Sequence, residues 1–94
     1  MEIERLVWPR HNIAKLAEHD IGQREVEELL RSGNVYAVDV HPEYADQVRI
    51  TGPTRAGRFL TIVLEETDRP GVWRPVTGWP ATRTEEAYYW RESL

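Results

Sequence analysis

The sequence contains no cysteine and no long hydrophobic run. Without cysteine there is no disulfide, no thiol nucleophile and no thiolate metal site. No apolar stretch approaches about 18 residues, and the N-terminus lacks the basic and apolar regions of a signal peptide. The histidines are scattered, at His11, His19 and His41, and no Walker A motif or dinucleotide fingerprint is present. We therefore expect a cytoplasmic protein that uses no membrane, no metal and no cofactor.

The charge is acidic overall but unevenly distributed. The formal net charge of −4 argues against a general nucleic-acid binder. Residues 1–48 hold 5 Lys and Arg against 10 Asp and Glu, whereas residues 49–94 hold 7 Arg, no Lys and 6 Asp and Glu. A local RNA site in the second half remains open, although long-range steering toward RNA would be weak.

Length and pattern predict a single α+β domain over residues 1–94, with its helices on one face of the sheet. Runs of β-branched and aromatic residues indicate strands, and apolar residues three and four positions apart indicate helices. The predicted order is a strand at 3–8, helices at 10–19 and 23–31, strands at 35–40, 48–51, 58–66 and 72–79, and a last helix after Thr82. Because Leu60, Ile62 and Leu64 alternate with Phe59 and Val63, we expect the strand at 58–64 to be central and covered on at least one face.

Local signals sharpen this prediction. The turn residues at 68–71 lie between two strand patterns and indicate a hairpin. Pro75 has no N–H to donate, so its strand needs an edge or a bulge there. The pair Thr82 and Glu85 matches a capping box. The expected apolar helix faces are Ile13, Leu16 and Ala17, then Val26, Leu29 and Leu30, and finally Ala87, Trp90 and Leu94.

Four arginines are candidates for an anion site: Arg49, Arg58, Arg74 and Arg83. Arg49 and Arg58 flank one turn, so we expect antiparallel pairing to bring them together on one face, where a guanidinium pair suits phosphate. The alternative is that each arginine pairs with a nearby acid such as Asp46, Glu65 or Glu85. Both interpretations stay open at this point.

His19 is the candidate for proton transfer, with Lys15 one helical turn back on the same face. The alternative is a surface histidine at a helix end. Aromatic residues near the arginines have the composition of a base-stacking surface, although most tryptophans in so small a domain belong to the core. These aromatic residues are Tyr44, Trp73, Trp79 and Tyr88.

Taken in order, several of these segments resemble the BrnT toxins of bacterial type II toxin–antitoxin systems, which belong to the RelE-like ribonuclease group. The likeness spans nearly the whole chain. Its pieces are a strand ending at Trp8, a helix closing on His19, Ile21 with residues 25–30, a strand ending at Gly52, the strand start at 56–60, and Ala81-Thr82 with Glu85 and Tyr88.

The resemblance implies a RelE-like fold: a small twisted antiparallel sheet with two N-terminal helices and a C-terminal helix packed on it. It also implies a metal-free endoribonuclease acting on mRNA and a small antitoxin, encoded nearby, as protein partner. The chain departs from the family pattern where the family commonly has cationic residues, because Glu18, Gln47 and Trp79 stand there. The fold is thus expected more firmly than the activity, which is expected to be weak.

If the chain cuts RNA, the sequence suggests a division of roles. Arg58 is the expected phosphate clamp, with Arg49 second, and His19 or Glu65 is the expected base. Tyr88 is the candidate proton donor. The expected RNA-binding residues are Lys15, Arg74, Arg83 and Trp79. A second hypothesis is a toxin-fold module without catalysis that binds a protein through aromatic residues around Trp73 and Trp79, and a third is a plain structural domain.

Overall fold

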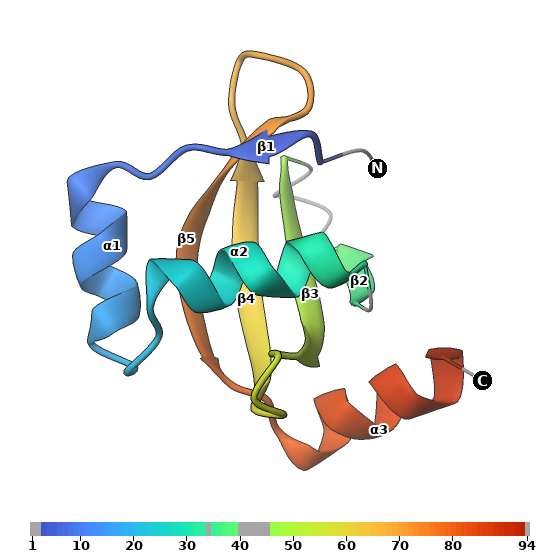
Figure 1. Ribbon diagram of the computed structural model, residues 1–94. Coiled ribbons are helices and arrows are strands. Elements are labelled where there is room, and N and C mark those ends of the chain that lie inside the picture. The colour runs from blue at the N-terminus through green and yellow to red at the C-terminus, as the bar shows by residue number, and fades with distance from the viewer. Residues whose placement is uncertain (1–2, 34, 40–45, 94) are drawn as a thin grey trace.

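The computed structural model describes residues 3–33, 35–39 and 46–93, and its centre is a five-stranded sheet in the order β1-β5-β4-β3-β2 (Figure 1). Helices α1 and α2 cross one face of this sheet, and α3 follows the last strand at its lower end. The elements are β1 (Arg5–Leu6), α1 (Arg10–Ala17), α2 (Gln23–Ser32), β2 (Tyr36–Asp39), β3 (Gln47–Pro53), β4 (Phe59–Glu66), β5 (Val72–Pro80) and α3 (Arg83–Ser93).

Strand β4 is the centre of the core, as its pattern predicts. Leu60, Ile62 and Leu64 point to one face and are completely buried. Their partners across the sheet include Ile50 in β3, which is also completely buried. Alternation at period two places every second residue of β4 against the helices, so one hydrophobic layer joins the sheet to α1 and α2.

The sheet is mixed rather than wholly antiparallel. Strands β2 to β5 pair antiparallel, as predicted, but β1 runs parallel to β5 and is only two residues long. The predicted bulge at Pro75 is confirmed, because Leu64 pairs with Pro75 while Val63 pairs with Thr77. One extra residue on β5 therefore separates the two pairs, and the missing proline N–H falls at this irregularity.

Helix α1 differs from its predicted apolar face. Leu16 is fully buried as expected, but Ile13 is 36% exposed, Ala17 is exposed, and Asn12 is buried in their place. Helix α1 packs on β5, where a Cβ at Gly78 would come within 3.0 Å of the Leu16 side chain. This close approach turns the Asn12–Leu16 side of the helix inward. Helix α2, in contrast, buries Val26 and Leu29 as predicted.

Helix α3 packs on the opposite face of the sheet from α1 and α2, so the prediction of helices on one face is wrong. The inward residue is Tyr89, whose ring stands edge-on to Phe59 at 5.3 Å between centroids. Ala87 is exposed and Trp90 is 50% exposed, so the predicted apolar face of this helix is also wrong. Short-range periodicity does not tell which side of an apolar-poor helix meets the sheet.

Some predicted features fall outside the described residues, namely His41, Tyr44, Leu94 and the end of the strand at position 40. Within the described part of the chain, no helix is both long and apolar enough to cross a bilayer.

Candidate functional site

The predicted site residues divide between the two faces of the sheet. Arg49 pairs across the ladder with Val63, and its neighbours in β3 point into the core, so its side chain lies on the α3 face. Arg58 precedes Leu60 by two residues and reaches Glu25 of α2 on the other face. The prediction that Arg49 and Arg58 converge is therefore wrong. In these two paired strands the odd-numbered and even-numbered residues point to opposite faces of the sheet, and Arg49 is odd whereas Arg58 is even.

Arg58 ties the end of α1 to the start of α2. Its Nη1 donates to the backbone carbonyl of Asp20 at 2.6 Å and to both carboxylate oxygens of Glu25 at 3.1 and 3.2 Å. Its Nη2 lies 3.5 Å from the carbonyl of His19. Glu25 also accepts the N–H of Gly22 at 3.1 Å. The guanidinium is thus anchored beside His19, with most of its donors directed at protein oxygens.

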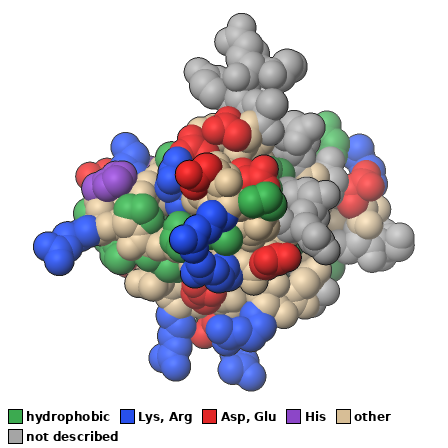
Figure 2. Space-filling model, turned by 90° about the horizontal axis from the view of Figure 1, so that it is seen from above, with side chains coloured by type: hydrophobic (Ala, Val, Ile, Leu, Met, Phe, Trp, Pro, Cys, Tyr) green, Lys and Arg blue, Asp and Glu red, His purple; other side chains and the backbone are tan. Residues whose placement is uncertain are grey.

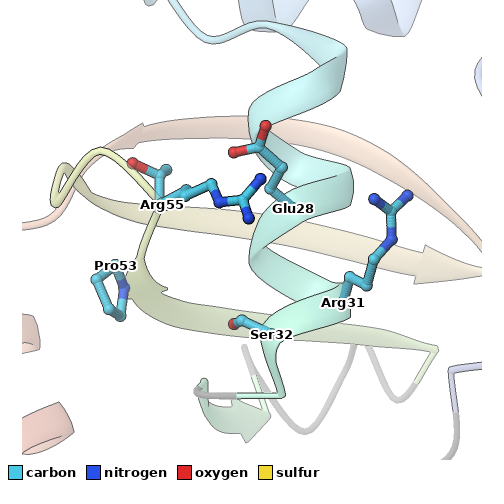
Figure 3. A pocket seen from close by; sticks show the side chains of 6 residues that line it. Glu28, Arg31, Ser32, Pro53 and Arg55 are labelled. Atoms are coloured by element: carbon cyan, nitrogen blue, oxygen red, sulfur yellow. The ribbon is translucent and has the colours of Figure 1, made fainter.

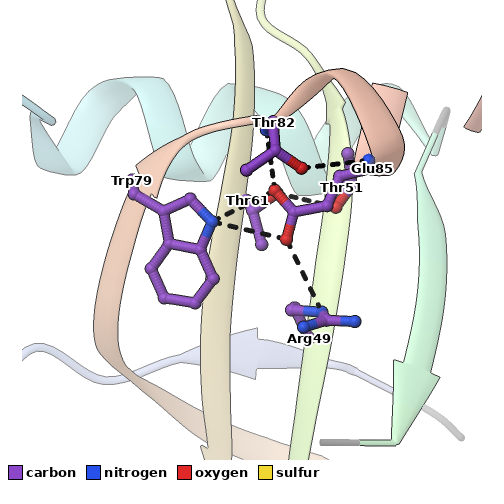
Figure 4. A network of polar contacts seen from close by, with 6 residues as sticks. All are labelled: Arg49, Thr51, Thr61, Trp79, Thr82 and Glu85. Carbon is purple, nitrogen blue, oxygen red and sulfur yellow. Dashed lines mark hydrogen bonds and ion pairs between the residues drawn. The ribbon is translucent and has the colours of Figure 1, made fainter. Parts of the chain in front are cut away.

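On the α3 face, the carboxylate of Glu85 collects several hydrogen bonds (Figure 4). Oε1 of Glu85 accepts three of them: from the hydroxyl of Thr61 at 2.9 Å, from the indole N–H of Trp79 at 3.1 Å and from the backbone N–H of Thr82 at 2.8 Å. Because the Thr61 hydrogen goes to Glu85, the hydroxyl of Thr51, 2.8 Å away, donates to Thr61. The predicted capping box is confirmed, since the Glu85 N–H in turn bonds Thr82 Oγ1 at 3.1 Å.

Arg49 completes this cluster, with its Nε 3.9 Å from Glu85 Oε2. Burial raises the pKa of Glu85, but the hydrogen bonds from Thr82, Thr61 and Trp79 together bring that pKa below its ordinary value. Glu85 is therefore held as an anion, which fastens the first turn of α3 to β4 and β5 and neutralises Arg49.

Arg74 is paired in the same way. Its Nη2 and Nε lie 2.6 and 2.8 Å from Glu65 Oε1, and Gln47 donates to Oε2 of the same carboxylate at 3.1 Å. The hydrogen bond from Gln47, followed by that from Arg74, lowers the pKa of Glu65. The expectation that nearby acids pair with the arginines is confirmed for Arg49 and Arg74. A base held in this way is a poor proton acceptor near neutral pH.

The stability of the protein should fall in acid because of these two carboxylates. Glu65 and Glu85 both have a folded-state pKa below 4.5, so they stabilise the fold above that value. The stabilisation is lost as pH falls through the folded-state pKa. Urea denaturation between neutral pH and about pH 3 should show the free energy of unfolding dropping below about pH 4.5. In Glu65→Gln/Glu85→Gln the drop should be smaller, and an identical drop would contradict this assignment.

The remaining candidates lie on the surface. Lys15 and His19 are exposed, and α1 ends at Ala17, so His19 belongs to the connection between α1 and α2 and not to the helix as predicted. Arg83 is exposed at the first residue of α3. Tyr88 is 42% exposed, with the guanidinium of Arg91 at 4.9 Å from its ring centroid.

The sequence prediction missed Glu25 as the partner of Arg58. The available signal was modest: Glu25 is the one acid in the first turn of α2, three residues after Gly22, which is the spacing of a capping pair. Its distance of 33 residues from Arg58 hid the ion pair. Among the described residues, no group of three or more His, Asp or Glu side chains is placed to hold a metal ion.

Comparison with known proteins decides the fold. No family model matches the chain, and no curated relative does. Among solved structures, the ribonuclease toxin BrnT of Brucella abortus superimposes with a TM-score of 0.63, covering 84% of this chain and 97% of that one. The chain has the fold of BrnT. The two sequences are 11% identical, so the BrnT-like fold is shared while most side chains differ.

The BrnT-like fold confirms the α+β architecture that the sequence resemblance implied. It leaves the chemistry to the side chains of this chain. Three of the four arginines predicted for an anion site, Arg49, Arg58 and Arg74, have carboxylate partners. Of these three arginines, only Arg58 contacts His19, and the contact is with the backbone carbonyl of His19.

Proposed function

We propose that the protein is a toxin that cuts RNA slowly and without metal, and that a small antitoxin encoded nearby restrains it in the cytoplasm. Two observations support this proposal. The chain shares its fold with a ribonuclease toxin, and Arg58 Nη2 lies 3.5 Å from the backbone carbonyl of His19. The second observation carries the chemical argument, because it places a cation against the backbone of the residue whose imidazole is the candidate base.

The reaction needs a base, a charge stabiliser and a proton donor. The 2′-hydroxyl loses its proton and attacks the phosphorus, the bond to the 5′-oxygen breaks, and that oxygen takes a proton. His19 is suited to accept the first proton, and Arg58 to face the charge on the phosphorane. The products are a 2′,3′-cyclic phosphate and a 5′-hydroxyl. Tyr88 remains a candidate donor, on α3.

Slow cleavage follows from the electrostatics. A phosphate must compete with Glu25 for Arg58, and the arginines of the α3 face are paired with Glu85 and Glu65. Figure 2 shows acidic and basic side chains lying next to one another over the face in view. With a net charge of −4, long-range attraction of RNA is weak. Losing one good transition-state donor typically costs about 100- to 1000-fold in rate.

The test is an RNA cleavage assay in EDTA with two histidine variants. We expect slow cleavage by the wild type and at least about a tenfold slower rate for His19→Gln, because a positioned base contributes that much or more. His11→Gln is the matched control, since His11 is also an exposed histidine of the N-terminal helical region. Analysis of the product ends should find cyclic phosphate.

Arg58→Ala is a poor test on its own, because Arg58 also holds the connection between α1 and α2. Equal rates for wild type and His19→Gln would remove His19 from the reaction. RNA left intact by the wild type, His19→Gln and His11→Gln alike would contradict the ribonuclease proposal.

The second candidate is a toxin-fold module that binds a protein partner without catalysis. The pairing of Arg49, Arg58 and Arg74 with carboxylates favours it. The prediction of an aromatic surface around Trp73 and Trp79 is wrong for Trp73, because Trp73 is buried in the core. Among the residues that the structure describes, the exposed aromatic side chains are instead those of Tyr88 and Trp90 in α3. Binding of the neighbouring gene product by both wild type and His19→Gln, with no RNA cleavage by either, would establish this candidate.

A further inference from the structure

The outer side of α2 carries a shallow groove that the candidate site does not use (Figure 3). Two adjoining hollows of about 480 and 540 Å³ share Glu28, Arg31 and Arg55 in their linings. Arg31 comes from the last turn of α2, and Arg55 reaches toward α2 from the turn between β3 and β4. Helix and turn together therefore present two guanidinium groups to one depression.

The acids of this groove are engaged, whereas its cations are available. Glu27 accepts the indole N–H of Trp8 at 2.9 Å, and Glu28 pairs with Arg24 at 3.9 Å. Neither Arg31 nor Arg55 has a hydrogen bond or ion pair with any of the described residues. This reverses the situation on the α3 face, where each sheet arginine already has a carboxylate. Because no described carboxylate pairs with Arg31 or Arg55, an incoming anion does not have to displace one to reach their guanidinium donors.

The turn that carries Arg55 is well ordered by its own hydrogen bonds. The N–H of Thr54 donates to the carbonyl of Arg58 at 2.8 Å, and the N–H of Gly57 donates to the carbonyl of Thr54 at 2.9 Å. The buried Thr54 hydroxyl accepts the N–H of Arg58 at 3.1 Å. Arg55 and Arg58 therefore project from one rigid turn, the first over the middle of α2 and the second toward its first turn.

We propose that this groove binds the sugar–phosphate backbone of single-stranded RNA and leads it to His19 and Arg58, an inference that rests on the proposed function. Arg58 is held at Glu25, Arg55 lies beside Glu28 (Figure 3), and Arg31 follows one turn later. From Glu25 to Arg31 the helix rises roughly 9 Å. The groove thus places two phosphate-binding donors in a line that ends at the candidate site.

Charge and continuity favour RNA over an acidic peptide as the occupant. Guanidinium groups bind phosphate with paired donors, and a backbone that repeats its charge can use both Arg31 and Arg55. The shared turn of Arg55 and Arg58 connects the groove to the place where the same strand would be cut. An acidic peptide would have no reason to continue from the groove to the cleavage site, so this connection favours RNA.

The experiment measures binding of a short 2′-O-methyl oligoribonucleotide, which lacks the attacking hydroxyl and stays intact. We expect Arg31→Ala/Arg55→Ala to bind about tenfold more weakly than wild type at low salt, because two phosphate contacts are lost. The slope of log affinity against log salt should fall by roughly 1.4. Arg69→Ala in the β4–β5 turn, at the opposite end of the sheet (Figure 1), is the matched control and should bind as wild type does. Circular dichroism should show all variants folded.

The outcomes separate this inference from the proposed function. Unchanged affinity and salt slope in the double variant would overturn the groove, even if the wild type cuts RNA. Binding of a polyglutamate peptide that depends on Arg31 and Arg55, with RNA binding unaffected by their loss, would also overturn it and make the groove a protein-docking site. Groove-dependent RNA binding by a protein that leaves natural RNA uncut would support the groove and contradict only the ribonuclease proposal.

Discussion

Replacing Ile62 by alanine should lower the free energy of unfolding by about 2–5 kcal/mol. Ile62 is completely buried in the central strand, between Ile50 of β3 and Gly78 of β5. Its Cδ1 would lie 2.8 Å from a Cβ at Gly78, so α1, β4 and β5 meet around this side chain. Removing three carbon atoms here leaves a cavity that a rigid sheet fills poorly. Urea denaturation monitored by tryptophan fluorescence gives the value.

Ile13→Ala is the control for this substitution. Ile13 has the same side chain but is 36% exposed on α1, so its loss should cost less than about 1 kcal/mol. If Ile62→Ala costs no more than Ile13→Ala, β4 does not form the centre of the core.

Replacing Glu85 by alanine should cost roughly 2–3 kcal/mol of unfolding free energy. The side chain is 13% exposed and accepts hydrogen bonds from Thr61, Trp79 and Thr82, and it pairs with Arg49. Its removal leaves these donors without their acceptor and loosens the first turn of α3. The fluorescence of Trp79 should change together with the melting temperature, because its indole N–H loses its partner.

Glu86→Ala removes the same kind of charge at the adjacent position of α3. The hydrogen bonds from Thr61, Trp79 and Thr82 go to Glu85, so Glu86→Ala should stay within about 0.5 kcal/mol of wild type. Similar losses for the two variants would show that Glu85 contributes only as a surface charge. Glu85→Gln, which keeps an acceptor oxygen, should fall between wild type and Glu85→Ala.

Local features of this protein were predictable from its sequence because their causes lie within a few residues. The turn at 68–71, the bulge at Pro75 and the capping pair of Thr82 and Glu85 all depend on backbone chemistry of short range. The alternation in β4 predicted the central strand for the same reason. The order of these elements was enough to indicate the fold, which the BrnT structure shares.

The site was less predictable because charges find partners across the fold. The ion pair of Arg58 with Glu25 joins two elements that are far apart in the chain. Whether Arg49 and Arg58 share a face of the sheet depends on the strand register, which the turn between their strands sets. The sequence by itself determined the elements, their order and the central strand. Only the tertiary structure decided which face α3 covers, which arginines are neutralised and which remain available, because packing and ion pairing act between residues that sequence spacing does not bring together.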